Sequence, residues 1–90
     1  MTADDALSLL TRLLRRIAPE VDPSELVPDA LLQEEFDLDS MDFLNLVTAL
    51  DEEAGVDVPE RDYPQLATVG GFVDYVVSAT SGSARSGAPD

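Results

Sequence analysis

Residues 39–55 read DSMDFLNLVTALDEEAG and hold both the start signal and the stop signal of one helix. Asp39 or Ser40 can cap the first turn, and Asp42 places a negative charge at the positive end of the helix dipole. Gly55 suits the left-handed backbone conformation that often follows the last helical residue. The stretch therefore predicts a helix that begins at about Ser40 and ends just before Gly55.

This helix carries apolar residues on two surfaces, and only one of them can face the core of a small domain. The larger surface consists of Phe43, Leu46, Val47, Leu50 and Ala54. The smaller surface consists of Met41, Leu44 and Thr48. Their spacing of i, i+3 and i+7 places them together on the other side of the helix.

A second amphipathic helix precedes this one. Its apolar residues recur with helical spacing: Ala6, Leu10, Leu13, Leu14 and Ile17. Thr2 and Asp5 resemble a capping box at its start, and Pro19 predicts its end. Three arginines occupy its last turns: Arg12, Arg15 and Arg16. We expect them to form an ordinary solvated end of the helix, with a docking patch as the alternative.

The connection between these helices is long for a compact domain and contains Pro19, Pro23 and Pro28. Apolar residues that could anchor it to the core are Leu26, Val27, Leu31, Leu32, Phe36 and Leu38. A helical turn is expected within DALLQEEF, which starts at Asp29. The connection is therefore predicted to be an ordered loop.

Beyond the central helix, Pro64 limits the next segment to a short helix that begins near Asp62 or Tyr63. Thr68 can cap a last helix. The apolar residues of this last helix are Val69, Phe72, Val73 and Val76. The predicted fold is all-α: a small four-helix bundle of three main helices and one short helix, with a long ordered loop between the first two main helices. We expect a folded domain over residues 1–78 and a disordered tail over residues 79–90, because the tail has few large apolar groups.

The charge of the chain restricts its partners. Nineteen Asp and Glu residues against five Lys and Arg give a formal net charge of −14. This field attracts basic protein surfaces and repels phosphates, so we expect no nucleic acid as a partner. No apolar run approaches the roughly 20 residues that span a bilayer, and the acidic start MTADDALSLL differs from a signal peptide. We therefore expect a cytoplasmic chain without a membrane span.

The chain has no Cys and no His, which excludes disulfides, Cys/His zinc sites and histidine-activated nucleophiles. No G-x-S-x-G element surrounds Ser40. A calcium loop over DLDSMD fails as well, because Met41 occupies a ligand position and Asp42 the position of the required glycine. We expect no catalytic residue, no metal site and no enzyme activity. Ser40 is then either a simple helix cap or a residue that another enzyme modifies.

The segments DSMDFLNLVTALDEEAGVDVP and LATVGGFVDYV resemble the acyl carrier protein family. In that family the second helix opens with Asp-Ser-Leu, a Gly follows it, and Ile/Val-x-Ile/Val-Pro and Thr-Val elements come later. Counterparts run without a gap from Asp39 to Val76. The resemblance implies that Ser40, preceded by Asp39, carries a covalent 4′-phosphopantetheine arm. A phosphopantetheinyl transferase that uses magnesium would add this arm from coenzyme A.

The resemblance also implies a carrier function, in which acyl intermediates of fatty-acid, polyketide or related specialised lipid synthesis travel as thioesters. The partners would be acyl-transferring or synthase enzymes with basic docking patches, and the carrier would be a monomer. The smaller apolar surface and its rim then form a docking face: Met41, Asp42, Leu44, Asn45, Thr48 and Glu52. Alternatively, Met41 and Leu44 pack under the long loop.

Four positions depart from the family pattern. Met41 replaces Leu, and Asp37 stands where Gly is frequent, although Asp tolerates unusual backbone angles. Asn45 and Ala54 stand where fatty-acid carriers usually have Glu and Phe. A specialised pathway is therefore plausible. Two further interpretations stay open: a peptidyl or aminoacyl carrier of nonribosomal synthesis, and an unmodified carrier-like module that only docks to a basic partner.

Overall fold

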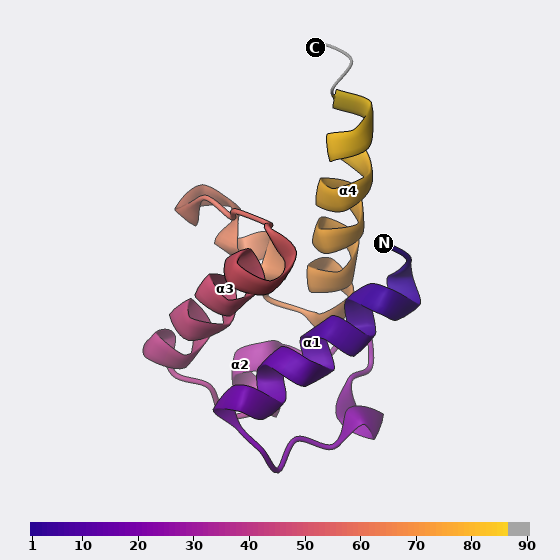
Figure 1. The fold of residues 1–90 in the computed structure, drawn as a ribbon. Helices are drawn as coiled ribbons and strands as arrows, with labels where there is room; N and C mark the ends of the chain where they lie inside the picture. Colours follow the sequence, from indigo (N-terminus) through magenta and orange to yellow (C-terminus); the bar gives the residue numbers. More distant parts are fainter. Residues whose placement is uncertain (87–90) are drawn as a thin grey trace.

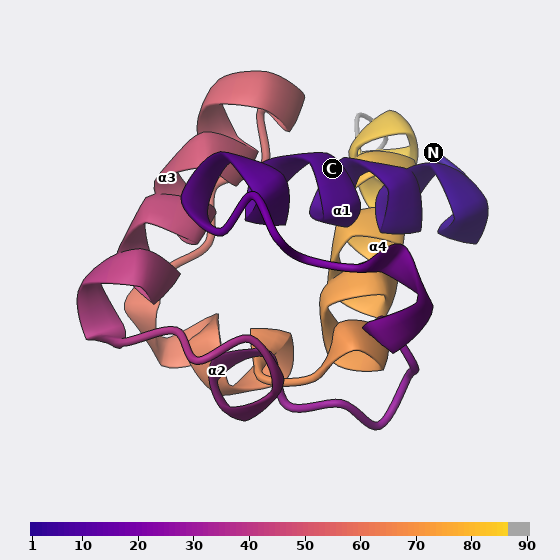
Figure 2. The same ribbon diagram turned by 90° about the horizontal axis from the view of Figure 1, so that it is seen from below.

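The structure, a computed structural model, describes residues 1–86, with side chains up to Thr80. The elements in chain order are α1 (Ala3–Ile17), η1 (Pro23–Glu25), α2 (Leu32–Glu35), α3 (Ser40–Ala54), η2 (Glu60–Leu66) and α4 (Val69–Ser86), where η denotes a 3-10 helix. α1 packs against α3 and α4, and η2 packs against α4. The long connection with η1 and α2 closes one end of the bundle (Figures 1 and 2). The predicted small all-α bundle is confirmed.

α3 begins and ends at the predicted residues. The Asp39 carboxylate accepts a hydrogen bond from the Asp42 N–H at 2.8 Å, and Gly55 follows the helix with a φ of 68°. The larger apolar surface faces the core, where Phe43, Leu46, Val47 and Leu50 are buried and Ala54 is half-buried. Ala49 is buried as well, which the sequence pattern did not predict.

α1 also has the predicted start and end. The Thr2 hydroxyl accepts a hydrogen bond from the Asp5 N–H at 3.1 Å, and the helix stops at Ile17. Its buried residues are Ala6, Leu9, Leu10, Leu13 and Leu14. Ile17 is only half-buried, and Leu9 takes a core position that was not predicted.

The long connection is ordered and anchored by buried side chains at Leu26, Leu32, Phe36 and Leu38. Val27 and Leu31 were also predicted to contact the core, and this is wrong, because they are 52% and 40% exposed. Leu31 has an extended backbone, so its side chain points away from the side that Leu32 occupies. The Leu32 N–H donates to the Ala67 carbonyl at 2.8 Å, which ties the connection to the start of α4.

The start of α4 is tightly packed. The Thr68 hydroxyl caps the helix by accepting a hydrogen bond from the Gly71 N–H at 3.0 Å. A Cβ atom at Gly71 would overlap the Gln65 carbonyl oxygen, and one at Gly70 would lie 3.2 Å from the Pro28 carbonyl oxygen. These two glycines therefore allow η2 and the connection to approach α4, which outweighs their poor helix propensity.

η2 is the short helix that was predicted near Asp62 or Tyr63, and it begins slightly earlier, at Glu60. The Tyr63 ring contacts the Phe43 ring of α3 edge to face, with centroids 5.6 Å apart. The Tyr75 hydroxyl of α4 donates to the Asp62 carboxylate at 2.7 Å. These contacts hold η2 against both α3 and α4.

α4 continues to Ser86, past the predicted domain end at residue 78. Residues 79–86, which were predicted to belong to a disordered tail, have a helical backbone in the structure. Residues 87–90 of the predicted tail lie outside the described residues. Among the described residues, no helix is long and apolar enough to cross a bilayer.

Candidate functional site

The first turn of α3 lies at the edge of the molecule, away from α4 (Figures 1 and 2). Ser40 is the first residue of this helix and is exposed. The Asp39 carboxylate caps the helix, and among the described residues the Ser40 hydroxyl has no hydrogen bond. The capping role that Ser40 could have filled therefore belongs to Asp39. The Ser40 hydroxyl stays free at the surface.

Two features fix the backbone around Ser40. The Asp42 carboxylate accepts a hydrogen bond from the Asp39 N–H at 3.4 Å, which completes a reciprocal capping box. Before the helix, Asp37 has a left-handed φ of 55°, and Leu38 is buried. The chain therefore turns at Asp37, is anchored at Leu38 and then presents the Asp-Ser pair outward. Asp37 adopts the backbone conformation that explains why Gly is frequent at this position in the family.

The chemistry available at this site is that of a hydroxyl group without a base. The chain contains no histidine, and the neighbouring carboxylates of Asp39 and Asp42 accept backbone N–H groups. The N–H groups of Ser40 and Met41 lie in the first turn, where an α-helix offers no carbonyl partner of its own. Such a helix start favours a bound phosphate group. The site therefore suits a serine that receives a phosphate-linked group from another enzyme.

The residues predicted to form a docking face lie on the outward side of α3. Met41 and Leu44 are 65% and 42% exposed, so the alternative in which they pack under the long loop is wrong. The other members of the set are exposed Asn45, Thr48 and Glu52 and half-buried Asp42. An apolar pair with a polar rim is thus open to a partner next to Ser40.

A groove of about 510 Å³ lies between this face and α1. Its α3 wall consists of Asp42, Asn45, Thr48, Ala49 and Glu52, and its α1 wall consists of Leu13, Arg16 and Ile17. Met41 and Leu44 are not among the residues that line it. Sequence reasoning did not find the α1 wall, because no local pattern indicates which residues of two helices meet.

An ion-pair clamp joins the same two helices. The Arg12 Nη2 atom lies 3.0 Å from Glu53 Oε1, and the Arg16 Nη1 atom lies 2.7 Å from Glu53 Oε2. The hydrogen bonds from Arg12 and then Arg16 lower the pKa of the Glu53 carboxyl group. These arginines are exposed at the end of α1, as expected, and two of them also pair with α3 through Glu53. Arg15 is also held, because its Nε atom donates to the Val21 carbonyl at 3.3 Å.

Residues 7–76 match the family model described as "Phosphopantetheine attachment site". The match runs from α1 into α4 and includes all of α3. Because it covers most of the chain, the chain belongs to the phosphopantetheine attachment family. Within this family its curated relatives are acyl carrier proteins, and the resemblance inferred from the sequence is confirmed.

Three of these relatives show the extent of the similarity. The acyl carrier protein of Thermosynechococcus vestitus is 39% identical over 56 residues, which cover 62% of this chain and 69% of the relative. The acyl carrier protein of Acidothermus cellulolyticus is 29% identical over 80 residues, which cover 89% and 94%. "Acyl carrier protein 2, mitochondrial" of Arabidopsis thaliana is 36% identical over 59 residues, which cover 66% and 47%.

The cofactor of this family is a covalently attached 4′-phosphopantetheine. Its phosphate suits the start of α3, where an exposed hydroxyl group and first-turn N–H groups lie together. When attached, the cofactor supplies a thiol that carries acyl groups as thioesters. The chain has no cysteine of its own that could do so.

Proposed function

We propose that Ser40 is the residue that carries the 4′-phosphopantetheine arm. The observation that supports this most directly is the free, exposed hydroxyl group of Ser40 beside a cap made by Asp39. During attachment the Ser40 oxygen forms a phosphoester bond with the pantetheinyl phosphate of coenzyme A. Adenosine 3′,5′-bisphosphate leaves, and the serine proton passes to the transferase. Asp39 is a positioning residue, because its carboxylate fixes the first turn.

The loaded carrier presents acyl intermediates to the enzymes of fatty-acid, polyketide or related specialised lipid synthesis and catalyses no step itself. The names of the curated relatives favour an acyl carrier over a peptidyl carrier. Asn45, in place of the Glu that is usual in fatty-acid carriers, favours a specialised pathway, since it changes a charge on the exposed side of α3.

The exposed surface of α3 formed by Met41, Asp42, Leu44, Asn45, Thr48 and Glu52 is the proposed docking face. Its apolar pair supplies the contact area, and its carboxylates attract basic patches on the transferase and on synthase enzymes. We propose a monomer with a carrier domain over residues 1–78. The proposed location is the cytoplasm, and fractionation of the source cells would distinguish it from an organelle such as that in the name of the Arabidopsis relative.

The attachment site is tested by Ser40→Ala, compared with Ser24→Ala at another exposed serine. Each full chain is incubated with coenzyme A, magnesium and a broad-specificity phosphopantetheinyl transferase. We expect the wild type and Ser24→Ala to gain the mass of one phosphopantetheinyl group and Ser40→Ala to gain none. Circular dichroism should show the same helix content in all three, since the Ser40 hydroxyl has no hydrogen bond among the described residues. Modification of Ser40→Ala would refute the assignment.

The docking face is tested by a double charge reversal, Asp42→Lys with Glu52→Lys. The matched control is Asp4→Lys with Asp74→Lys, which changes the net charge equally at exposed positions on α1 and α4. We expect the α3 reversal to lower kcat/KM for the transferase about tenfold at low salt, mainly through slower association. High salt should reduce this difference because it screens exposed charges. Equal losses in the two double variants would show that only the overall charge matters.

A further inference from the structure

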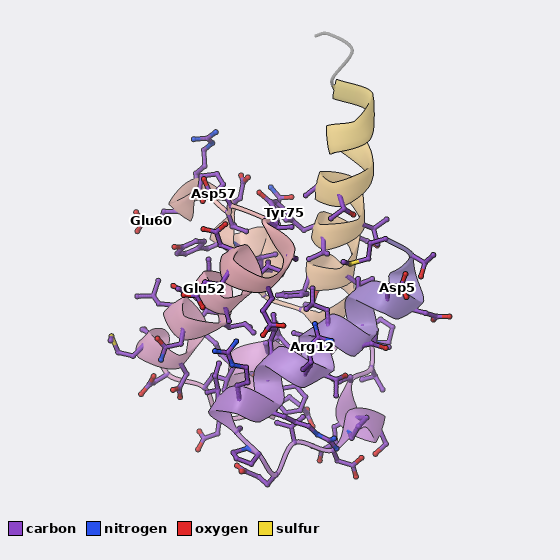
Figure 3. The ribbon with its side chains drawn as sticks, in the orientation of Figure 1. Asp5, Arg12, Glu52, Asp57, Glu60 and Tyr75 are labelled. Atoms are coloured by element: carbon purple, nitrogen blue, oxygen red, sulfur yellow. The ribbon has the colours of Figure 1, made fainter. Side chains whose placement is uncertain are left out.

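The groove between α1 and α3 has charges of both signs on its walls. Arg16 contributes a guanidinium group from α1, while Asp42 and Glu52 contribute carboxylates from α3. Figure 3 labels Glu52 on α3 and Arg12 on α1, the two helices that enclose the groove. The whole sequence has only five basic residues against a net charge of −14. Arg16 therefore places a positive charge beside the acidic docking face. This charge opposes the general attraction between that face and basic partners.

Glu53 pairs with only one of the nitrogen atoms of the Arg16 side chain. The ion pair uses the Nη1 atom of Arg16, and the side chain remains 53% exposed. Among the described residues, no other nitrogen of Arg16 has a hydrogen bond. A guanidinium group has five N–H donors in one plane and can hold a second carboxylate beside the first. Arg16 is therefore held by Glu53 through one nitrogen, lines the groove and keeps donors that no residue of the described part of the chain uses.

We propose that the α1–α3 groove selects the docking partner by reading a charge pattern of both signs. The partner that the covalent arm requires is the phosphopantetheinyl transferase. Its docking segment presents a carboxylate to Arg16 and basic side chains to Asp42 and Glu52. Pairing of both signs fixes the register of the two proteins and rejects surfaces that are merely basic, because these meet Arg16 with a like charge. This inference rests on the proposed function and extends the docking face to α1.

Arg12 provides a matched control for Arg16. Both arginines pair with Glu53, and their side chains are 61% and 53% exposed. Only Arg16 lines the groove. Arg16→Glu and Arg12→Glu therefore add the same negative charge and remove the same kind of contact with Glu53. Only Arg16→Glu changes a residue that lines the groove.

The experiment measures kcat/KM for modification of each full chain by the transferase, at low and high salt. Added negative charge alone speeds the encounter with a basic partner, so Arg12→Glu should match or exceed the wild type. Arg16→Glu should fall about tenfold below Arg12→Glu at low salt, because a charged hydrogen bond is replaced by repulsion. Circular dichroism confirms folding, and Arg16→Gln against Arg12→Gln makes the same comparison if the reversed variants unfold.

Equal rates for the two variants, or a faster Arg16→Glu, would overturn the inference and leave the attachment site intact. In that case the partner surface is uniformly basic, and Arg16 serves only the clamp. A wild-type chain that accepts no phosphopantetheinyl group would overturn the proposed function and this inference together.

Discussion

Asp37 is the residue at which the chain turns from α2 toward the attachment site. Its φ of 55° lies in the left-handed region, and it is the only non-glycine residue with a positive φ among the described residues. Asp and Asn tolerate this region because their short polar side chains can bond locally, whereas a β-branched residue is strained there. The orientation of Ser40 therefore depends on Asp37, which is not part of the proposed docking face.

We expect Asp37→Asn to change the free energy of unfolding by less than about 0.5 kcal/mol. Asp37→Val should lower it by about 1–2 kcal/mol, the usual cost of left-handed backbone for a residue with a Cβ. Urea unfolding measures both. The control is Asp29→Val, at an exposed residue of the same connection without a positive φ. If Asp37→Val proved as stable as Asp37→Asn, the backbone would not be strained at this position.

Glu53 links two elements, α1 and α3, at the far end of α3 from Ser40. Its pKa is lowered by the hydrogen bonds from Arg12 and Arg16. A carboxyl group with a lower pKa in the folded state binds fewer protons there than in the unfolded chain. Such a group stabilises the fold above the ordinary pKa of 4.5, and this stabilisation disappears as the pH falls through the lowered pKa.

Glu53→Gln should therefore lower the melting temperature at about pH 7, and the difference from the wild type should shrink as the pH falls below 4.5 and through the lowered pKa of Glu53. The effect should be small, because the pair is partly exposed and solvent weakens exposed ion pairs. Glu52→Gln is the control, since Glu52 has no ion pair within the described residues. A deficit of Glu53→Gln that stayed constant across this pH range would show that charge is not the cause.

At the scale of the molecule, the described side chains divide into an apolar core and a charged surface. No polar or charged residue is buried among them. The acidic surface attracts basic partners over a distance of about one Debye length, roughly 10 Å at 0.1 M salt. The few basic residues on this acidic surface, such as Arg16, then decide which of those basic partners fit.

Much of this arrangement could be predicted from local signals in the sequence. The bounds of α3 follow from Asp39 and Gly55, because capping residues act within one turn of the helix they end. The prediction failed where distant segments meet. No local rule indicates that Glu53 pairs with Arg12 and Arg16, or that Leu31 faces solvent while its backbone pairs with Thr68.

The start of α3 also shows what local sequence signals cannot decide. The sequence left open whether Asp39 or Ser40 caps α3, since both residue types are good caps. The structure assigns the cap to Asp39. The Ser40 hydroxyl is therefore free of the capping role, which is consistent with its proposed role as the attachment site.

The attachment of the arm to Ser40 is tested by locating the arm on the wild-type chain. After incubation with coenzyme A, magnesium and the transferase, the protein is digested and the modified peptide is fragmented in a mass spectrometer. We expect one phosphopantetheinyl group per chain, with fragment masses that place it on Ser40. A group on any other residue, or an unmodified chain under conditions that modify a known acyl carrier protein, would contradict this assignment.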